Sequence, residues 1–217
     1  MQYIFAPGCA LMAYKPNLVE RLKDWVESQY GPMETLQTCC FLSPKLEPGT
    51  CVVTPCATCT VNYLKGQKDC SSLFLLSAIA KSDNFPFPDY GGRHMSIQDT
   101  CSARSNLEYL EAVRTILKRL NINLVEPERS GAKSKCCGQV FYGKLPEDKV
   151  AFQMKSRAQE MPCEDVVTYC ASCIMAMTVG GKRPRYILDL LFGEPTSLPD
   201  SIKQWNSKLK NIRETER

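Results

Sequence analysis

The chain of 217 residues has room for one domain or two small ones, and its 44% hydrophobic and 23% charged residues are typical of a globular protein. This composition excludes wholesale disorder, and no apolar run reaches the length of a membrane helix. The formal net charge of +4 is too nearly balanced to indicate nucleic-acid binding. Because the first residues lack the pattern of a secretory signal, we expect a cytoplasmic protein.

Strands and helices are predicted to alternate along the chain. Four short segments rich in β-branched or aromatic residues lead up to cysteines and read as strands, and a fifth has a similar composition. They are residues 3–6, 50–54, 96–99, 165–168 and 123–126. Apolar spacing predicts helices over 17–30 and around 107–120, a helix from Pro146 to about Glu160, and a helix capped by Ser201. This order indicates a parallel α/β fold with cysteines at the carboxyl ends of the strands, where such sheets bind ligands.

Thirteen cysteines stand out, and ten of them form two copies of one pattern. Each copy consists of a single cysteine, an adjacent pair and a C-x-x-C motif. The first copy is Cys9, Cys39, Cys40, Cys56 and Cys59, and the second is Cys101, Cys136, Cys137, Cys170 and Cys173. Cys51, Cys70 and Cys163 lie outside the pattern, and we expect them to be small packing residues.

The sequence around the cysteines repeats as well. CVVTPCATC in the first half resembles DVVTYCASC in the second, and an apolar stretch ending in glycine follows each. We therefore predict a duplicated domain, with residues 1–92 as the first half and residues 93–217, including the C-terminal helix, as the second. The join falls near residues 82–93, where proline, aspartate and glycine concentrate.

Three kinds of structure use cysteines in such numbers. Disulfides are rare in a reducing cytosol. Zinc takes four ligands in a closed tetrahedral site, whereas each copy offers five thiols, two of them adjacent. Iron–sulfur clusters are held by soft thiolates on several separated irons, so two copies suit two clusters. The residues favour iron–sulfur clusters, with zinc and disulfides as the alternatives.

The arrangement C…CC(G)…C-x-x-C, present twice, resembles the family of cysteine-rich CCG domains, whose type member is the B subunit of heterodisulfide reductase. The second copy is similar in Cys136-Cys137-Gly138, Cys101-x-x-Arg104 and the segment GGKRPRYILDLLFG at 180–193. The resemblance implies two Rossmann-like α/β halves with short parallel sheets, and a non-cubane 4Fe–4S cluster on the five cysteines of each copy. The first copy departs from the family pattern, because Phe41 replaces the glycine and the stretch before C-x-x-C is about half as long.

The resemblance implies a redox enzyme that reduces a disulfide or thiol-type substrate, with electrons from a partner subunit carrying further clusters or a flavin. The alternative is a non-catalytic electron-transfer subunit linked to a dehydrogenase or a quinone. The sequence has no dinucleotide, ATP or ferredoxin motif, so another protein must bring or take the electrons. The single histidine, His94, is expected in a surface or packing role or, alternatively, at a cluster as a proton donor. Lys182, Arg183 and Arg185 are expected at a solvated helix start or, alternatively, at a docking site for an acidic partner or substrate.

Overall fold

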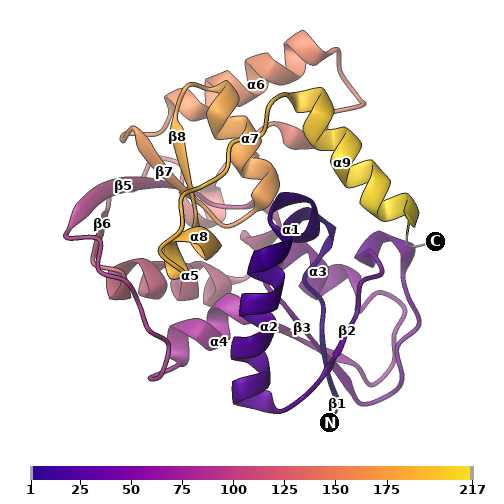
Figure 1. The fold of residues 1–217 in the computed structure, drawn as a ribbon. Helices are drawn as coiled ribbons and strands as arrows, with labels where there is room; N and C mark the ends of the chain where they lie inside the picture. Colours follow the sequence, from indigo (N-terminus) through magenta and orange to yellow (C-terminus); the bar gives the residue numbers. More distant parts are fainter. Residues whose placement is uncertain (1, 216–217) are drawn as a thin grey trace. The chain divides into compact units, whose positions relative to one another are not determined.

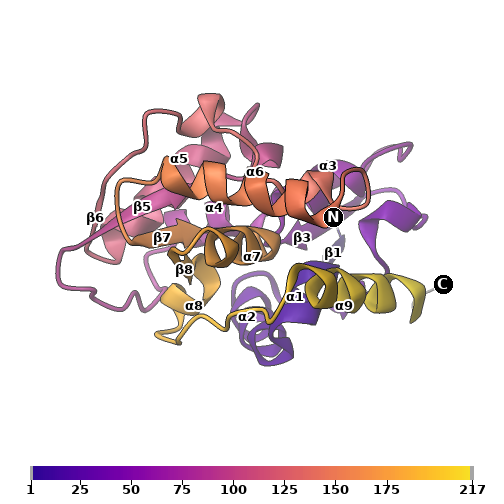
Figure 2. The ribbon, with the colours of Figure 1, turned by 90° about the horizontal axis from the view of Figure 1, so that it is seen from above.

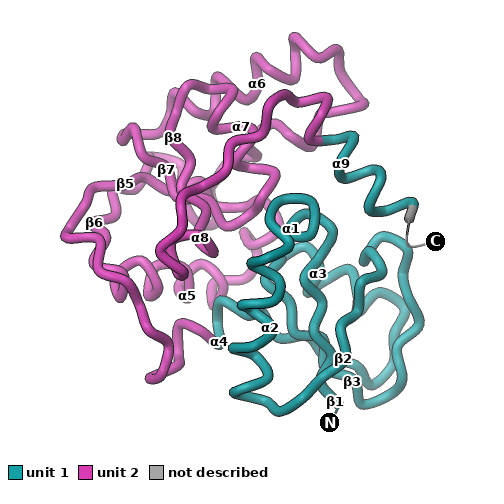
Figure 3. The backbone as a smooth tube through the Cα atoms, in the orientation of Figure 1, with its two compact units in different colours: residues 1–78, 206–217 teal, residues 79–205 magenta. Residues whose placement is uncertain are grey.

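The computed structural model describes residues 2–215, and in this range the strands form two four-stranded parallel sheets flanked by helices. The chain divides into two compact units (Figure 3). One comprises residues up to Ala78 together with those from Asn206, and the other is Ile79–Trp205. The predicted α/β class in two halves is confirmed. From the sequence we assigned the whole C-terminal helix to the second half, whereas the residues of this helix from Asn206 onward belong to the first unit. The boundary between the halves at residue 92 stays a prediction.

The first sheet has the strand order β2-β1-β3-β4, and all neighbouring strands are parallel. Its strands are β1 (Gln2–Phe5), β2 (Glu34–Thr35), β3 (Thr50–Thr54) and β4 (Ser71–Phe74). Its helices are α1 (Cys9–Tyr14), α2 (Pro16–Tyr30) and α3 (Ala57–Asn62), and α4 (Leu75–Lys81) follows β4. Right-handed connections from β1 to β2 and from β3 to β4 run in opposite directions, so they cover opposite faces.

The second sheet repeats this topology in the order β6-β5-β7-β8. Its strands are β5 (Arg93–Gln98), β6 (Ile122–Leu124), β7 (Asp165–Thr168) and β8 (Arg183–Tyr186). Its helices are α5 (Leu107–Arg119), α6 (Glu147–Gln159), α7 (Ala171–Val179) and α8 (Ile187–Leu191). Figure 1 shows α6 and α7 on one side of this sheet and α5 and α8 on the other. The fold therefore supports a duplicated domain.

The helix α6 has no counterpart in the first half. It connects β6 to β7 and packs beside α7 (Figures 1 and 2). Between β2 and β3 the described chain has only a short 3₁₀ turn at Cys40–Leu42 and a loop. The shorter stretch of the first cysteine pattern is thus the place where this helix is missing.

The predicted long helices are confirmed to within a few residues, and their ends have local causes. Pro16 stands at the first position of α2, which ends at Tyr30 and is followed by Gly31 with a φ of 84°. The C-terminal helix α9 spans Ile202–Thr215, and the Ser201 hydroxyl accepts a hydrogen bond from the Gln204 amide at 3.1 Å. Within the described residues no helix has both the length and the apolar character needed to cross a membrane.

The basic run after the second C-x-x-C motif is a strand, so the expected helix start is wrong there. In β8, Arg183 Nη2 lies 3.1 Å from Asp165 Oδ2, and Arg185 Nε lies 2.9 Å from Asp165 Oδ1. Alternate residues of a strand share one face, so both arginines reach the same carboxylate of β7. Lys182 donates to the backbone carbonyls of Met161 and Cys163 at 3.0 Å.

Candidate functional site

Each half gathers its cysteines at the carboxyl ends of its strands. In the first half, Cys9 opens α1 after β1, the pair Cys39-Cys40 follows β2, and Cys56 caps α3 after β3. The second half repeats this placement after β5, β6 and β7. Because the carboxyl ends of neighbouring parallel strands meet at one edge of the sheet, residues far apart in sequence come together there.

The thiols of each half contact one another in the same order. In the first half the contacts run through Cys9, Cys39, Cys40, Cys59 and Cys56, and in the second through Cys101, Cys136, Cys137, Cys173 and Cys170. The Cys59 and Cys40 sulfurs lie 3.5 Å apart. We name these sets the first and the second cysteine group. They contain the ten cysteines chosen from the sequence, although the role of these residues as ligands stays a prediction.

Hydrogen bonds from neighbouring thiols lower the pKa of one cysteine in each adjacent pair. Cys40 and Cys136 each accept hydrogen bonds from the thiols on both sides, which lowers the pKa of Cys40 to about 4 and that of Cys136 to about 2. Their neighbours show the opposite effect. Hydrogen bonding to these thiolates and then burial raise the pKa of Cys59 and of Cys101, because both favour the protonated form.

The second group is supported by a buried aspartate. Asp99 is fully buried two residues before Cys101, and both its oxygens accept hydrogen bonds from the Arg114 guanidinium, at 2.9 and 3.1 Å. It also accepts from the Tyr169 hydroxyl at 2.9 Å and from the Gly131 amide at 2.6 Å. Since Tyr169 directly precedes the second C-x-x-C motif, this carboxylate joins the ends of two strands to the loop between β6 and α6.

A buried arginine of α6 holds the segment that leads to the adjacent pair of the second group. Arg157 Nε donates to Gln98 Oε1 at 2.6 Å, and its Nη2 donates to the Arg129 carbonyl at 3.0 Å and to the Ser134 hydroxyl at 3.2 Å. Its Nη1 pairs with Glu160 at 2.6 Å. Few buried arginines are tolerated without such pairing, so α6 fixes the loop before the pair through this side chain.

The first group is enclosed by a different set of residues, among them Gly8, Asn62 and Tyr63. A side chain on Gly8, which has a φ of 81°, would place its Cβ 3.3 Å from Cys59 Sγ. The Tyr63 hydroxyl donates to the Thr38 carbonyl at 2.7 Å and so fixes the residue before the pair. Asn62 Nδ2 lies 3.6 Å from Cys40 Sγ. Four of the five cysteines in this group are buried, whereas in the second group Cys101 is exposed.

The three remaining cysteines lie outside these contacts. Cys51 is buried within β3, Cys70 Sγ lies 3.4 Å from the Glu47 carbonyl oxygen, and the Cys163 amide donates to the Ser96 hydroxyl at 2.7 Å. Their contacts suit the packing roles expected from the sequence.

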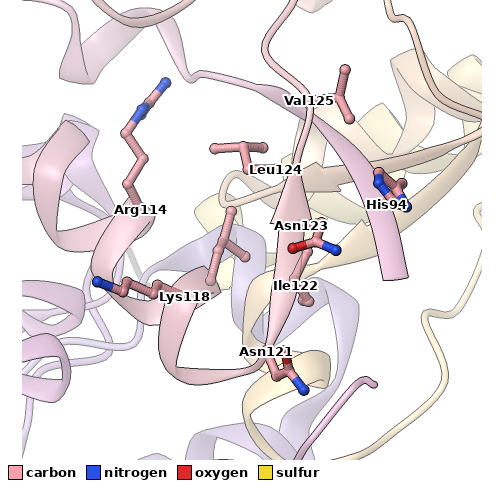
Figure 4. Close-up of a pocket in the computed structure, with 9 residues that line it drawn as sticks. His94, Arg114, Lys118, Asn121, Ile122, Asn123, Leu124 and Val125 are labelled. Atoms are coloured by element: carbon pink, nitrogen blue, oxygen red, sulfur yellow. The ribbon is translucent and has the colours of Figure 1, made fainter. Parts of the chain in front are cut away.

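His94 lies far along β5 from the cysteines, at the exposed amino end of the strand. With Arg114 and Lys118 it lines a groove of about 560 Å³ beside β6, and no cysteine is among the described lining residues (Figure 4). The surface placement expected for His94 is therefore confirmed, and a role in proton delivery at a cluster is not supported.

An iron–sulfur cluster fits the donor set of each group. Five thiols share a partly buried space in which hydrogen bonds to neighbouring thiols, and then burial, raise the pKa of Cys59 and Cys101, and a bound cation would displace their protons. Arg104, three residues after Cys101, has two buried guanidinium nitrogens, Nε and Nη2, without a hydrogen-bond partner in residues 2–215. Such donors normally have partners, and an anionic group beside them would provide one. Within the same range, no three His, Cys, Asp or Glu side chains are placed to bind one metal ion together. An iron–sulfur cluster does not need such a set, because its thiolates bind to separate irons.

Asp99, Tyr169 and Arg157 were not singled out from the sequence, although they hold the second group in place. Of these three residues, only Asp99 has a recognisable feature in the sequence, because it is a carboxylate between a predicted strand and a cysteine. The contacts of Arg157 depend on α6 packing against the sheet, which no local pattern reports.

Comparison with known proteins agrees with this geometry. Residues 95–178 match the model of the family described as "Cysteine-rich domain", CCG, which occurs in iron–sulfur proteins such as heterodisulfide reductase subunits. This match contains all five cysteines of the second group. The chain is also similar to a "Probable membrane-anchored ferredoxin" of Chromohalobacter salexigens, with 28% identity over 103 residues. The aligned region covers 45% of this chain but only 15% of that relative. The family resemblance inferred from the sequence is confirmed for residues 95–178.

Proposed function

We propose, from the CCG cysteine-rich domain of residues 95–178, that this chain is an iron–sulfur redox protein with one cluster on each cysteine group. The observation that carries this proposal is the identical order of thiol contacts in the two halves. The two copies of the duplicated domain differ in length, yet both keep the same five thiols in contact, which packing alone would not require. Non-cubane 4Fe–4S clusters are the form that we propose for both groups.

A bound cluster supplies one-electron oxidation and reduction. The chain contributes ligation and polarity. Cys136 accepts hydrogen bonds from the backbone amides of Gly138 and Val140, and Cys39 accepts one from the amide of Phe41. Hydrogen bonds to thiolate sulfurs stabilise their charge and raise the reduction potential of a cluster that they hold.

The second group is our proposed site for a disulfide or thiol-type substrate. A substrate sulfur must reach the site directly, and Cys101 is exposed while Cys136 and Cys170 are half-buried. The buried contacts of Asp99 and Arg157 hold the surrounding loops in place, so this access does not depend on a loosely ordered segment. A partner protein with clusters or a flavin would deliver the electrons, because the chain carries no nucleotide motif.

Electron transfer without catalysis is the second candidate function. The similarity to a protein named as a ferredoxin favours it, and so does the burial of the first group, because a relay needs closeness to another cofactor and shielding from small molecules. The name of that relative includes a membrane anchor, and a membrane-bound partner is compatible with either function. A cytoplasmic location of this chain stays a prediction.

The test starts with protein purified without oxygen. We expect iron and acid-labile sulfide approaching two multi-iron clusters per chain, and stoichiometric zinc without sulfide would overturn the proposal. Reoxidation of reduced viologen by a panel of disulfides then separates the two functions. Turnover supports the catalytic site, while no turnover across a broad panel by protein with full iron content favours the relay.

A further inference from the structure

An arginine from the C-terminal helix lies against the first cysteine group. The Arg213 guanidinium hydrogen-bonds to the thiols of Cys9 and Cys39. Its central carbon lies 5.2 Å from the centre of the Phe41 ring. Residues from Asn206 onward belong to the same compact unit as these three, so the contact is internal to that unit.

The second half has an arginine near its cysteines at a position where the first half has none. Arg104 lies three residues after Cys101, and the residue three positions after Cys9 is Met12. A thioether neither carries charge nor donates a hydrogen bond. Arg213 therefore brings to the first group, from the other end of the chain, the type of side chain that its own helix α1 lacks.

Phe41 provides the surface on which Arg213 rests. It occupies the place of Gly138 in the repeat, and 61% of its surface is exposed. A guanidinium over an aromatic face is attracted by the ring, and the ring also limits its movement. An arginine side chain is cationic at all ordinary pH values, so this contact brings one positive charge to the first group.

We propose that Arg213 is the positioning and charge-compensating residue of the first cysteine group. This inference rests on the proposed function. A fixed cation that donates to two thiolates stabilises the reduced state of their cluster, which carries one more negative charge than the oxidised state. Arg213 would therefore raise the reduction potential of the first cluster and hold Cys9 and Cys39 in place for ligation.

The experiment uses the full chain, loaded anaerobically with ferrous iron and sulfide and titrated with dithionite while the paramagnetic signals are followed. Arg213→Gln should move one midpoint potential to more negative values and leave the other unchanged. A tenfold change in the one-electron equilibrium constant, about 59 mV, is the size we expect. Arg213→Lys keeps the positive charge and should move this midpoint less.

Lys210 gives the matched control. It lies on the same helix, is exposed and pairs with Glu214 at 3.7 Å, so Lys210→Gln removes the same charge from the chain without touching the thiols. Phe41→Leu removes the ring beneath the guanidinium and should cause a smaller shift in the direction of Arg213→Gln. This second variant tests the contact if Arg213→Gln folds poorly.

The outcomes separate this inference from the proposed function. If the midpoint potentials of Arg213→Gln and Phe41→Leu are the same as those of the wild type at full iron content, the role of Arg213 is overturned while the proposed function stands. A shift in Lys210→Gln as large as that in Arg213→Gln also overturns it, because net charge would then suffice. A wild-type chain that takes up no iron or sulfide overturns the proposed function and this inference together.

Discussion

Gly138 lies so close to Met154 that a Cβ on the glycine would stand 3.0 Å from both the Cγ and the backbone nitrogen of Met154. Met154 belongs to α6, the helix that the first half lacks. Phe41 takes the place of Gly138 in the first copy, where no such helix excludes a side chain. The two departures of the first copy, its phenylalanine and its shorter stretch, therefore have one physical cause.

Gly138→Ala should destabilise the chain more than Gly143→Ala. Both glycines have a left-handed backbone, with φ of 103° and 77°, but a Cβ on Gly143 would meet nothing within 4 Å. Left-handed backbone alone costs about 1–2 kcal/mol for alanine. Overlap with Met154 should add about 1–3 kcal/mol in Gly138→Ala. Urea unfolding measures both, and equal losses would contradict the close packing against α6.

Tyr169→Phe should lower stability by an amount that depends on pH. The Tyr169 hydroxyl donates to Asp99 at 2.9 Å, and a buried hydrogen bond to a charged group contributes about 1.5–3 kcal/mol. Burial, followed by the charge of Asp99, raises the pKa of Tyr169 above its ordinary value of 10. As the pH rises above about 10, the unfolded chain loses this proton first, so the folded state loses stability.

The measurement is the difference in unfolding free energy between wild type and Tyr169→Phe at several pH values. We expect the difference to be largest below pH 10 and to shrink at higher pH, because the variant has no proton to lose at this position. A difference that stays constant from neutral to alkaline pH would contradict the raised pKa of Tyr169, because the unfolded chain would then gain nothing by losing this proton first.

The ten cysteines of the two groups should differ from the other three when serine replaces them. Serine supplies a harder and poorly ionised oxygen, so Cys137→Ser or Cys170→Ser should reduce the iron content or change the cluster spectrum. Cys51→Ser and Cys70→Ser should leave the spectrum intact and cost only packing. Iron and sulfide analysis checks this, and an equal loss of iron in Cys51→Ser and Cys56→Ser would refute the assignment in the first group.

Arg157→Met should weaken the second group and leave the first unchanged. Leaving a buried hydrogen-bonding group without its partner costs about 1–3 kcal/mol. Here Gln98 Oε1 and the Arg129 carbonyl would lose the arginine as donor, and the loop before Cys136-Cys137 would loosen. Lys155→Met, at an exposed position of the same helix, is the control. We expect Arg157→Met to lose about half of its iron and Lys155→Met to keep its full iron content. Full iron content in both variants would count against a role for Arg157.

The sequence predicted the central strands better than the edge strands. Residues 50–54 and 165–168 are rich in β-branched residues and mostly buried, and the structure has β3 and β7 at those positions. The edge strand β8, Arg-Pro-Arg-Tyr, has no strand-like composition. Its conformation comes from pairing with β7, in which Pro184 stands opposite Val166, and this contact is not visible in a local pattern.

The candidate site was predictable to the extent that it follows from topology. Parallel strands place the residues at their carboxyl ends together, so motif spacing was enough to choose the ten cysteines. The side chains around them were not predictable in the same way. The contact of Arg213 with Cys39 joins opposite ends of the chain, and that of Arg157 with Gln98 needs the packed position of α6.

The last prediction concerns access to the two groups. Cys101 is exposed, while Cys9, Cys39, Cys40 and Cys59 are all buried, so a small thiol should reach the second cluster more readily than the first. Added thiols should change the paramagnetic signal of the oxidised protein. The change should persist in Cys56→Ser, which impairs the first group, and disappear in Cys170→Ser, which impairs the second. The reverse result would place substrate access at the first group, and an unchanged signal with a broad panel of thiols at full iron content would favour electron transfer as the function of both.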